Sequence, residues 1–414
     1  MSDWKWTGPA EPMLLLMRAM RARGHEIELV CPQPPAGAGR SLAEEAAKRG
    51  LAPIARIAPG RSAWQRGDGA RVGRLAEWLA TAALGGPFDV VHTWHTRDHV
   101  LAARALGRLP LASVSASAST VGPSAEAGGR GGPTRIVRFA SRAEPIADRP
   151  WNRWLFGRAC DGLLCVGAAS AAANRRVRPI GPLAVTPGAV DLEALARAQA
   201  NRPDETPEGA RARRRRLACE ALGVPEDGLL IGVVARLQAH RRFDLLLDAL
   251  AACVRRRPEL RLVLFGRGTR AAEVVDGPVR ARGLEGCVVR AGYRVDDYAP
   301  LLAAMDLFTF LVPGSDGTCR ALREAAALGL PLVGTRRGAI PEIIVEGETG
   351  LLVDERPEAL AAAWERLAAD PIARRAMGEA ARRDARARCS PEHMAAFTEA
   401  FYAEVVRSAP TSSR

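Results

Sequence analysis

The chain has 414 residues, a formal net charge of +13 and 48% hydrophobic residues, which excludes the disordered and collagen-like classes of protein. One hydrophobic core rarely supports this length, so the sequence predicts two domains. Lys5 and Lys48 are the only lysines, so the charge indicates a general preference for arginine, with an anionic partner such as phosphate or lipid as the alternative. No aromatic RNA-binding motif accompanies the charge, and we expect no nucleic acid among the partners.

The cysteines and the N-terminal segment indicate the cellular compartment in which the chain is expected. The eight cysteines are scattered, without a CxxC pair or a Cys/His cluster at zinc spacing, which predicts reduced cysteines and no metal site. The first residues lack a basic region followed by an apolar core, and no stretch has the uninterrupted apolar length of a membrane-spanning helix. We therefore expect a cytoplasmic chain that contacts a membrane at most peripherally.

The first half alternates amphipathic stretches with short apolar runs, the pattern of a parallel sheet covered by helices. Helices are predicted over residues 13–23, 41–49 and 72–84, and strands over residues 26–31, 88–92 and 111–115. These elements predict one Rossmann-like domain over residues 1–198.

The second half repeats the pattern more clearly. Strands are predicted over residues 229–234, 260–265, 287–289, 307–311 and 331–333, and helices over residues 243–255 and 318–328. We expect a second Rossmann-like domain over residues 199–389, with a hinge near the polar segment 199–209. Residues 390–414 are predicted to form a crossover helix and tail, with Ser390 as N-cap, Pro391 in the first turn and an apolar face that packs back on the first domain.

The segment SDGTCRALREAAALGLP, residues 315–331, carries the strongest local signal for function. It follows an apolar strand and places Asp316 eight residues before Glu324. Ligands of an open parallel sheet bind beyond the carboxyl ends of its strands, where helix N-termini present free amides. We therefore expect a ligand there. The alternative is a plain N-cap followed by an ion pair between Arg320 and Glu324.

Two further segments follow strands of the same domain. Arg236 ends the first strand and Arg241 lies in the loop after it. Two guanidinium groups at such a junction suit a pyrophosphate, although a charged exposed loop is the alternative. Gly266 opens the turn GRGT after the next strand. The third glycine of the dinucleotide fingerprint is missing, so a nicotinamide cofactor gains little support.

In this order the segments resemble the retaining GT-B glycosyltransferases of family four, which include bacterial envelope polysaccharide and lipopolysaccharide-core sugar transferases. The resemblance is strongest from residue 229 to residue 353, through Arg236, Gly266, the GYR at 292–294, residues 316–331 and GAIPEIIVEGETGLLV from Gly338. The resemblance extends over nearly the whole chain through four shorter segments, namely TGPAEP, RGHEIELVCP, FDVVHTWHTRDH and PGAVD. It implies an α/β fold with two Rossmann-like domains facing each other across a cleft.

The resemblance also implies three groups of site residues. The donor diphosphate and sugar would be held by charged side chains and amides, namely Arg236, Arg241, Asp316, Gly317, Thr318 and Cys319. The nucleoside would lie against Gly266, Tyr293, Arg294 and, at its ribose hydroxyls, Glu324. The acceptor side would include Gly8 and, as a contact to the acceptor or the donor sugar, His95.

Four features depart from the family pattern. Asp316 stands where the family usually has glutamate, and Arg242 replaces a glycine beside the phosphate-binding cation. The family's first strand is expected before TGPAEP, where this sequence has residues 1–6. Many relatives have a catalytic histidine at the position where this chain has Ala116. Three residues are open as substitutes for that histidine, namely His95, Ser115 and Ser117.

The resemblance implies an enzyme that transfers a sugar, with retention, from a UDP-, GDP- or ADP-sugar to a glycan or lipid-linked acceptor. No cofactor and no metal is expected, because two guanidinium groups offset the diphosphate charge. The arginine run at 211–216 is a candidate for peripheral contact with an anionic membrane. The alternatives are a nucleotide-sugar epimerase or hydrolase on the same fold, or a catalytically silent nucleotide-sugar-binding protein.

Overall fold

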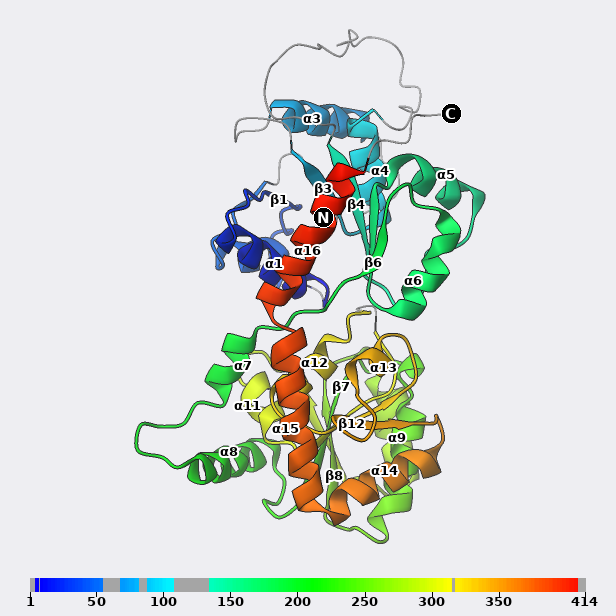
Figure 1. The fold of residues 1–414 in the computed structure, drawn as a ribbon. Helices are drawn as coiled ribbons and strands as arrows, with labels where there is room; N and C mark the ends of the chain where they lie inside the picture. Colours follow the sequence, from blue (N-terminus) through cyan, green and yellow to red (C-terminus); the bar gives the residue numbers. More distant parts are fainter. Residues whose placement is uncertain are drawn as a thin grey trace. The chain divides into compact units, whose positions relative to one another are not determined.

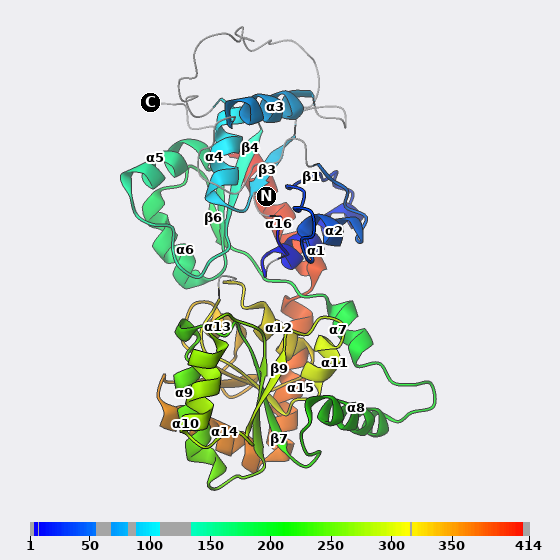
Figure 2. The ribbon, with the colours of Figure 1, turned by 180° about the vertical axis from the view of Figure 1, so that it is seen from behind.

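The computed structural model describes residues 4–6, 8–54, 68–81, 88–107, 134–314 and 317–408. The chain divides into two compact units, unit 1 (Met1–Thr186 with Met394–Arg414) and unit 2 (Pro187–His393). Each unit is built on a parallel sheet covered by helices, as Figure 1 and Figure 2 show. The expected α/β class with two Rossmann-like halves is confirmed.

Unit 1 contains a four-stranded parallel sheet, β3-β4-β5-β6, and a separate parallel pair, β1-β2. Its strands are β1 (Leu29–Val30), β2 (Pro53–Ile54), β3 (Val90–Thr93), β4 (Arg135–Ala140), β5 (Gly162–Cys165) and β6 (Leu183–Val185). Its helices are α1 (Ala10–Ala22), α2 (Leu42–Ala47), α3 (Asp68–Thr81), α4 (Thr96–Ala105), α5 (Pro150–Ala159), α6 (Ala168–Asn174), the short η1 (Arg175–Val177) and α16 (Pro391–Arg407). The strand expected over residues 111–115 lies outside the described residues.

Both faces of the four-stranded sheet are buried. Ile136 and Leu163 pack on one face with α4 and α5, whereas Val137 and Phe139 pack on the other with α1 and α16. Successive strand residues point to opposite faces, so a strand buried on both sides needs an apolar residue at nearly every position.

The last helix, α16, lies directly on β5. A β-carbon added to Gly162 would lie 2.7 Å from a methyl group of Val405, so glycine allows the close approach. At the start of the helix, the backbone N–H of His393 donates to the Oγ of Ser390 at 3.0 Å. The predicted N-cap and the packing of the C-terminal helix on the first domain are both confirmed.

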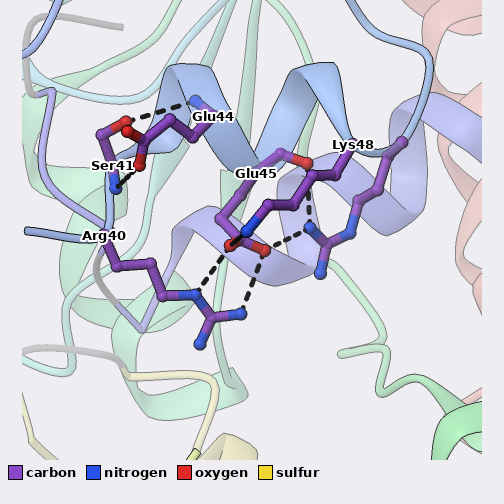
Figure 3. Close-up of polar contacts among 6 residues, drawn as sticks. Arg40, Ser41, Glu44, Glu45 and Lys48 are labelled. Carbon is purple, nitrogen blue, oxygen red and sulfur yellow. Dashed lines mark hydrogen bonds and ion pairs between the residues drawn. The ribbon is translucent and has the colours of Figure 1, made fainter.

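The short helix α2 is fixed by charge as well as by its cap. Ser41 and Glu44 form a capping box, with hydrogen bonds of 3.1 and 3.2 Å between the backbone N–H of each and the side chain of the other (Figure 3). The next residue, Glu45, is buried, and its carboxylate contacts three cations at 2.9, 3.1 and 2.6 Å, namely Arg40, Lys48 and Arg49. Hydrogen bonds from these cations, with that of Arg40 the largest effect, lower the pKa of Glu45 to about 2.

Unit 2 contains a six-stranded parallel sheet in the order β12-β11-β10-β7-β8-β9. The strands are β7 (Leu229–Val234), β8 (Leu260–Phe265), β9 (Val288–Gly292), β10 (Leu307–Phe310), β11 (Leu332–Thr335) and β12 (Gly350–Val353). The helices are α7 (Leu192–Ala198), α8 (Pro207–Leu222), α9 (Phe243–Val254), α10 (Gly277–Ala281), α11 (Tyr298–Ala303), α12 (Arg320–Ala327), α13 (Ile340–Ile343), α14 (Pro357–Ala369) and α15 (Pro371–Arg388), with short turns η2 (Ala239–Arg241) and η3 (Ala272–Asp276).

The strands of unit 2 also alternate between two apolar layers. Leu229 and Ile231 face a layer that includes α9 and α14, whereas Leu230 faces a layer that includes α8, α11, α12 and α15. Figure 2 shows α9, α10 and α14 on one side of this sheet and α8, α11 and α15 on the other. The predicted bounds of the first two strands agree with those of β7 and β8.

The division between the units falls between Thr186 and Pro187, whereas the sequence placed a boundary after residue 198. The physical reason is that α7 contributes Leu195 to the core of unit 2. The helix α7 and the arginine-rich α8 are therefore parts of unit 2.

Candidate functional site

The chain order of the strands in unit 2 reverses between β7 and β10, which are neighbours in the sheet. In a doubly wound sheet, ligands bind at this reversal, beyond the carboxyl ends of the strands. The loops that meet this condition are residues 235–242, after β7, and the segment after β10, of which residues 311–314 and 317–319 are described. Most of the predicted site residues of unit 2 lie in these loops, in the two neighbouring loops or in α12.

The glycine turn after β8 lies directly against the loop after β7. Gly266 has a φ of +143°, and a β-carbon there would lie 2.0 Å from the carbonyl oxygen of Ala235. Gly268 repeats this relationship, with a β-carbon 2.2 Å from the carbonyl oxygen of Leu237. The backbone N–H of Leu237 donates to the carbonyl of Arg267 at 3.2 Å. These glycines therefore let two backbone segments touch, whatever ligand lies beyond them.

The two predicted cations lie near each other. Arg241 is half-buried, and its Nη1 donates to the carbonyl oxygen of Val312, in the loop after β10, at 2.7 Å. Burial lowers the pKa of Arg241, and the positive charge of Arg236 lowers it further. Arg236 is exposed, and no carboxylate among the described residues pairs with either guanidinium. Two adjacent cations without an acidic partner suit a ligand that carries more than one negative charge.

The turn before α12 differs from the prediction. The sequence predicts a helix that starts at Thr318, but α12 begins at Arg320, so the predicted start is wrong by two residues. Cys319 has a φ of +53°, in the left-handed region, and is therefore excluded from a right-handed helix. Gly317, Thr318 and Cys319 form a buried turn instead. Asp316 lies outside the described residues, as do Ser115, Ala116 and Ser117.

Glu324 is a buried carboxylate, 7% exposed, in the second turn of α12. The hydroxyl of Tyr298 donates to its Oε2 at 2.8 Å. The Nη1 of Arg320 lies 3.6 Å from its Oε1, so the ion pair considered in the sequence is also present. Burial raises the pKa of Tyr298 well above its usual value, and the Glu324 charge raises it further. The phenol therefore remains protonated and acts as a donor.

The buried side chain of Arg323 fixes the turn before α12. Its Nε donates to the carbonyl oxygen of Thr318 at 2.9 Å, and its Nη1 to the sulfur of Cys389 at 3.2 Å. A β-carbon on Gly188 would lie 2.5 Å from the same Nε. Arg323 thus holds the turn against two segments near the ends of unit 2. These segments are joined by a hydrogen bond of 3.1 Å from the backbone N–H of Val190 to the carbonyl oxygen of Cys389.

The loop after β9 presents one of its two predicted residues to solvent. Tyr293 is half-exposed, and the guanidinium carbon of Arg267 lies 4.4 Å from its ring centroid. Arg294 donates to the carbonyl of Ala291 at 2.7 Å and to Asp297 at 2.9 Å. Arg294 therefore fixes the shape of the loop, whereas Tyr293 offers an aromatic surface.

The backbone and ion pairs of Arg242 show how an arginine is held where the family usually has a glycine. Its φ is +58°, a conformation that glycine adopts without strain. Its guanidinium pairs with Glu355 at 2.9 Å and with Asp244 at 3.2 Å. The side chain is thus held by acidic residues of its own unit.

The predicted residues of unit 1 lie at the starts of helices. His95 is the N-cap of α4, where its backbone N–H donates to the Oδ2 of Asp98 at 3.0 Å, and its side chain is 36% exposed. Gly8 lies in the turn before α1. His92 and His99 are held in the interior instead, because His92 contacts the Tyr402 hydroxyl and His99 a backbone carbonyl, both at 2.6 Å. Of the three histidines, His95 is the accessible one.

The arginines of α8 have structural partners. Arg213 pairs with Glu205 at 2.9 Å, and Arg214 donates to the carbonyl of Gln199 at 2.9 Å. Arg215 donates to Asp306 at 3.0 Å and to the carbonyl of Ala304. Three of the five arginines at 211–216 therefore fasten α8 to unit 2, while Arg211 and Arg216 are exposed.

Sequence reasoning missed Tyr298 and Arg323. A signal for Tyr298 existed, because the chain has only three tyrosines and this one closely follows GYR. Arg323 carried no signal, since its partner Cys389 is distant in the sequence. Within the described ranges, no group of three His, Cys, Asp or Glu side chains has the arrangement of a metal site, and no helix has the length and apolar character to cross a bilayer.

Two family models match the chain. "Glycosyltransferase Family 4" matches residues 10–194, and "Glycosyl transferases group 1" matches residues 228–370. Together the matches include both sheets and the loops of the candidate site.

Similar proteins agree with these matches. A D-inositol 3-phosphate glycosyltransferase from Corynebacterium urealyticum is 32% identical over 239 residues, which are 55% of this chain and 51% of that protein. An N-acetyl-alpha-D-glucosaminyl L-malate synthase from Bacillus anthracis is 29% identical over 45% of this chain and 48% of its own length. These matches thus span about half the length of each relative. In structure, HepE from Anabaena, solved in complex with UDP, superposes with a TM-score of 0.73 and 16% identity, covering 97% of this chain and 98% of its own.

Proposed function

The chain belongs to the family-4, group-1 glycosyltransferases with the GT-B fold, and from this premise we propose that it transfers a sugar, with retention, from a nucleoside-diphosphate donor to a glycan or lipid-linked acceptor in the cytoplasm. The observation that carries the proposal is the pair Arg236 and Arg241 at the strand-order reversal of unit 2, where no described carboxylate neutralises either cation. The UDP bound to HepE, a protein of the same fold, supports the choice of donor class.

The proposed chemistry breaks the bond between the sugar C1 and the diphosphate oxygen and forms a bond from C1 to an acceptor hydroxyl oxygen. The acceptor proton leaves to the departing diphosphate. Arg236 and Arg241 stabilise the charge that develops on the diphosphate, a contribution that needs neither an enzyme nucleophile nor a metal. A bound cofactor has no role in this scheme.

The remaining site residues receive proposed roles from their positions. Asp316 and the amides of the turn at 317–319 contact the donor sugar. Glu324 accepts from the ribose hydroxyls, and Tyr293 lies against the base with Gly266 beside it. Arg294 supports that loop. In unit 1, His95 contacts the acceptor or the donor sugar, and Gly8 lies on the acceptor side.

A ligand screen tests the donor class. One of UDP, GDP and ADP should raise the melting temperature, because a ligand that binds only the folded state stabilises it by mass action. Transfer is then measured with the matching sugar nucleotide and an acceptor panel that includes the classes named in the relatives, inositol 3-phosphate and malate, beside lipid-linked sugars. No stabilisation by any of the three nucleotides would reject the proposal.

The same assay separates the two alternatives. A nucleotide-sugar epimerase or hydrolase would change or cleave the donor without an acceptor. A silent binding protein would gain stability from the nucleotide and leave the donor intact in every mixture. Acceptor-dependent release of nucleoside diphosphate distinguishes transfer from both.

We also propose a peripheral contact with an anionic membrane, made by α5 rather than by α8. Trp151 is 48% exposed and lies with its ring centroid 4.8 Å from that of Trp154. The guanidinium carbon of Arg158 lies 5.6 Å from the Trp154 ring centroid. Tryptophan beside arginine is the combination that favours the interface of an anionic bilayer. Further exposed arginines adjoin this helix, namely Arg149, Arg175, Arg176 and Arg178.

A further inference from the structure

Tyr298 and Glu324 connect two helices of unit 2 through one polar contact. Tyr298 is the first residue of α11, and its hydroxyl donates to the Oε2 of Glu324, in α12, at 2.8 Å. The ring of Tyr298 packs edge-on against Phe265, the last residue of β8, with centroids 6.1 Å apart. The phenol is thus fixed by packing at one end and by the carboxylate at the other.

The carboxylate of Glu324 retains capacity to accept further hydrogen bonds. An ionised carboxylate offers about four lone-pair sites on two oxygens. Among the described residues, the Tyr298 hydroxyl is the only group that hydrogen-bonds to it, and the nearest cation, Arg320, lies 3.6 Å from Oε1. Burying a carboxylate is costly unless its acceptor sites are used, so the empty sites at Oε1 fit a ligand that carries hydroxyl donors.

We propose that Tyr298 is a positioning residue that holds the Glu324 carboxylate in the orientation in which Oε1 accepts from the ribose hydroxyls of the donor nucleotide. The inference rests on the proposed function, because it assumes that a nucleoside diphosphate occupies this site. A hydroxyl suits the task, since a neutral donor at Oε2 fixes the carboxylate without pairing with its negative charge and leaves the hydrogen-bonding sites of Oε1 to the ligand. The phenol of Tyr298 remains protonated beside that charge.

A purely structural tie between α11 and α12 would make a different prediction. It would weaken the binding of every ligand equally when the hydroxyl is removed, because it would act on the fold of the site. A positioning role would weaken only ligands that possess the ribose hydroxyls. Affinities for UDP and for 2′,3′-dideoxy-UDP therefore separate the two roles.

The experiment uses calorimetry to compare wild type with Tyr298→Phe, Glu324→Gln and the double variant. The ligands are UDP and its dideoxy analogue. If GDP or ADP stabilises the wild type more than UDP does, that nucleotide and its dideoxy analogue replace them. Tyr298→Phe should lower the affinity for UDP about tenfold and leave the affinity for the dideoxy analogue unchanged. In the double variant the two losses should not add, because both act through one carboxylate. Tyr402→Phe is the matched control, since it removes a buried hydroxyl that contacts His92 in unit 1, and it should leave UDP affinity unchanged.

An equal loss for both ligands, or no loss for UDP, would overturn the positioning role while nucleotide binding itself stood. Failure of the wild type to bind UDP, GDP or ADP would instead reject the proposed function, and the role of Tyr298 with it. Melting temperatures of all variants show whether each is folded at the temperature of the titration.

Discussion

A β-carbon on Gly266 would lie 2.0 Å from the carbonyl oxygen of Ala235. The glycine turn after β8 is therefore in backbone contact with the loop that carries Arg236 and Arg241. The positions of both cations depend on the absence of a side chain at this turn.

Replacing Gly266 with alanine should displace the loop after β7, because backbone atoms cannot yield as a flexible side chain does. We expect a loss of stability of about 1–3 kcal/mol together with weaker nucleotide binding. Gly286→Ala is the matched control in the same unit, since a β-carbon there meets nothing within 4 Å. Denaturant unfolding and UDP titration check both effects, and an unaltered Gly266→Ala protein would show that the contact is unimportant.

The buried carboxylate of Glu45 should make unit 1 sensitive to acid. Its pKa is lowered to about 2 from 4.5, so the folded state binds the proton less readily than the unfolded state. The contribution is fully present above about pH 5 and is lost as the pH falls toward 2, on the order of 2 kcal/mol in all. Glu45→Gln should therefore melt well below wild type at pH 7 and by a clearly smaller margin at pH 3. If the difference in melting temperature stayed the same at both pH values, the charged cluster would not be its origin.

Transfer should persist in EDTA and gain little from added magnesium or manganese. In the proposed chemistry the guanidinium groups of Arg236 and Arg241 offset the diphosphate charge, which divalent cations offset in other nucleotide enzymes. The measurement is the rate of transfer after chelation and after metal is restored. Abolition by EDTA and recovery with metal would contradict the scheme.

Binding to vesicles should depend on α5. A variant with Trp151→Ser, Arg149→Gln and Arg158→Gln should sediment less with vesicles that contain phosphatidylglycerol, by about 1 kcal/mol for each arginine, and wild-type binding should fall with salt. Arg211→Gln with Arg216→Gln, on α8, is the comparison variant and should bind nearly as wild type does. Loss in the α8 variant alone would assign the membrane contact to the arginine run instead.

Much of unit 2 could be predicted from the sequence, because its central strands, such as β7 and β10, are short, mostly apolar runs that are buried on both faces. Unit 1 was harder for a physical reason. The strand β4 carries Arg135 and Arg138 within its apolar run, yet both are buried, since Arg138 donates to the carbonyl oxygens of Thr93 and Phe139 and Arg135 to that of Ser408. A buried arginine with backbone acceptors has the same sequence signature as an exposed one.

The candidate site, too, could be predicted from the sequence only in part. Strand order alone brings the loops after β7 and β10 together, so the proximity of Arg241 to the loop after β10 was predictable. The late start of α12 depends on the left-handed conformation of Cys319, which no residue preference predicts. The contact from Tyr298 to Glu324 depends on how two helices pack, which local pattern does not encode.

The most direct test of the proposed diphosphate site is the affinity of Arg236→Ala for UDP, measured by calorimetry with Arg255→Ala as the control variant. If GDP or ADP stabilises the wild type more than UDP does, that nucleotide is used instead. Arg236 is exposed and has no described acidic partner, so its removal should leave the melting temperature unchanged. Losing a hydrogen bond to a charged group costs about 1.5–3 kcal/mol, and the affinity should therefore fall roughly 10- to 150-fold. Arg255, exposed at the far end of α9, should be replaceable without effect on binding. Equal affinities for wild type, Arg236→Ala and Arg255→Ala would contradict the assignment of the diphosphate to the loop after β7.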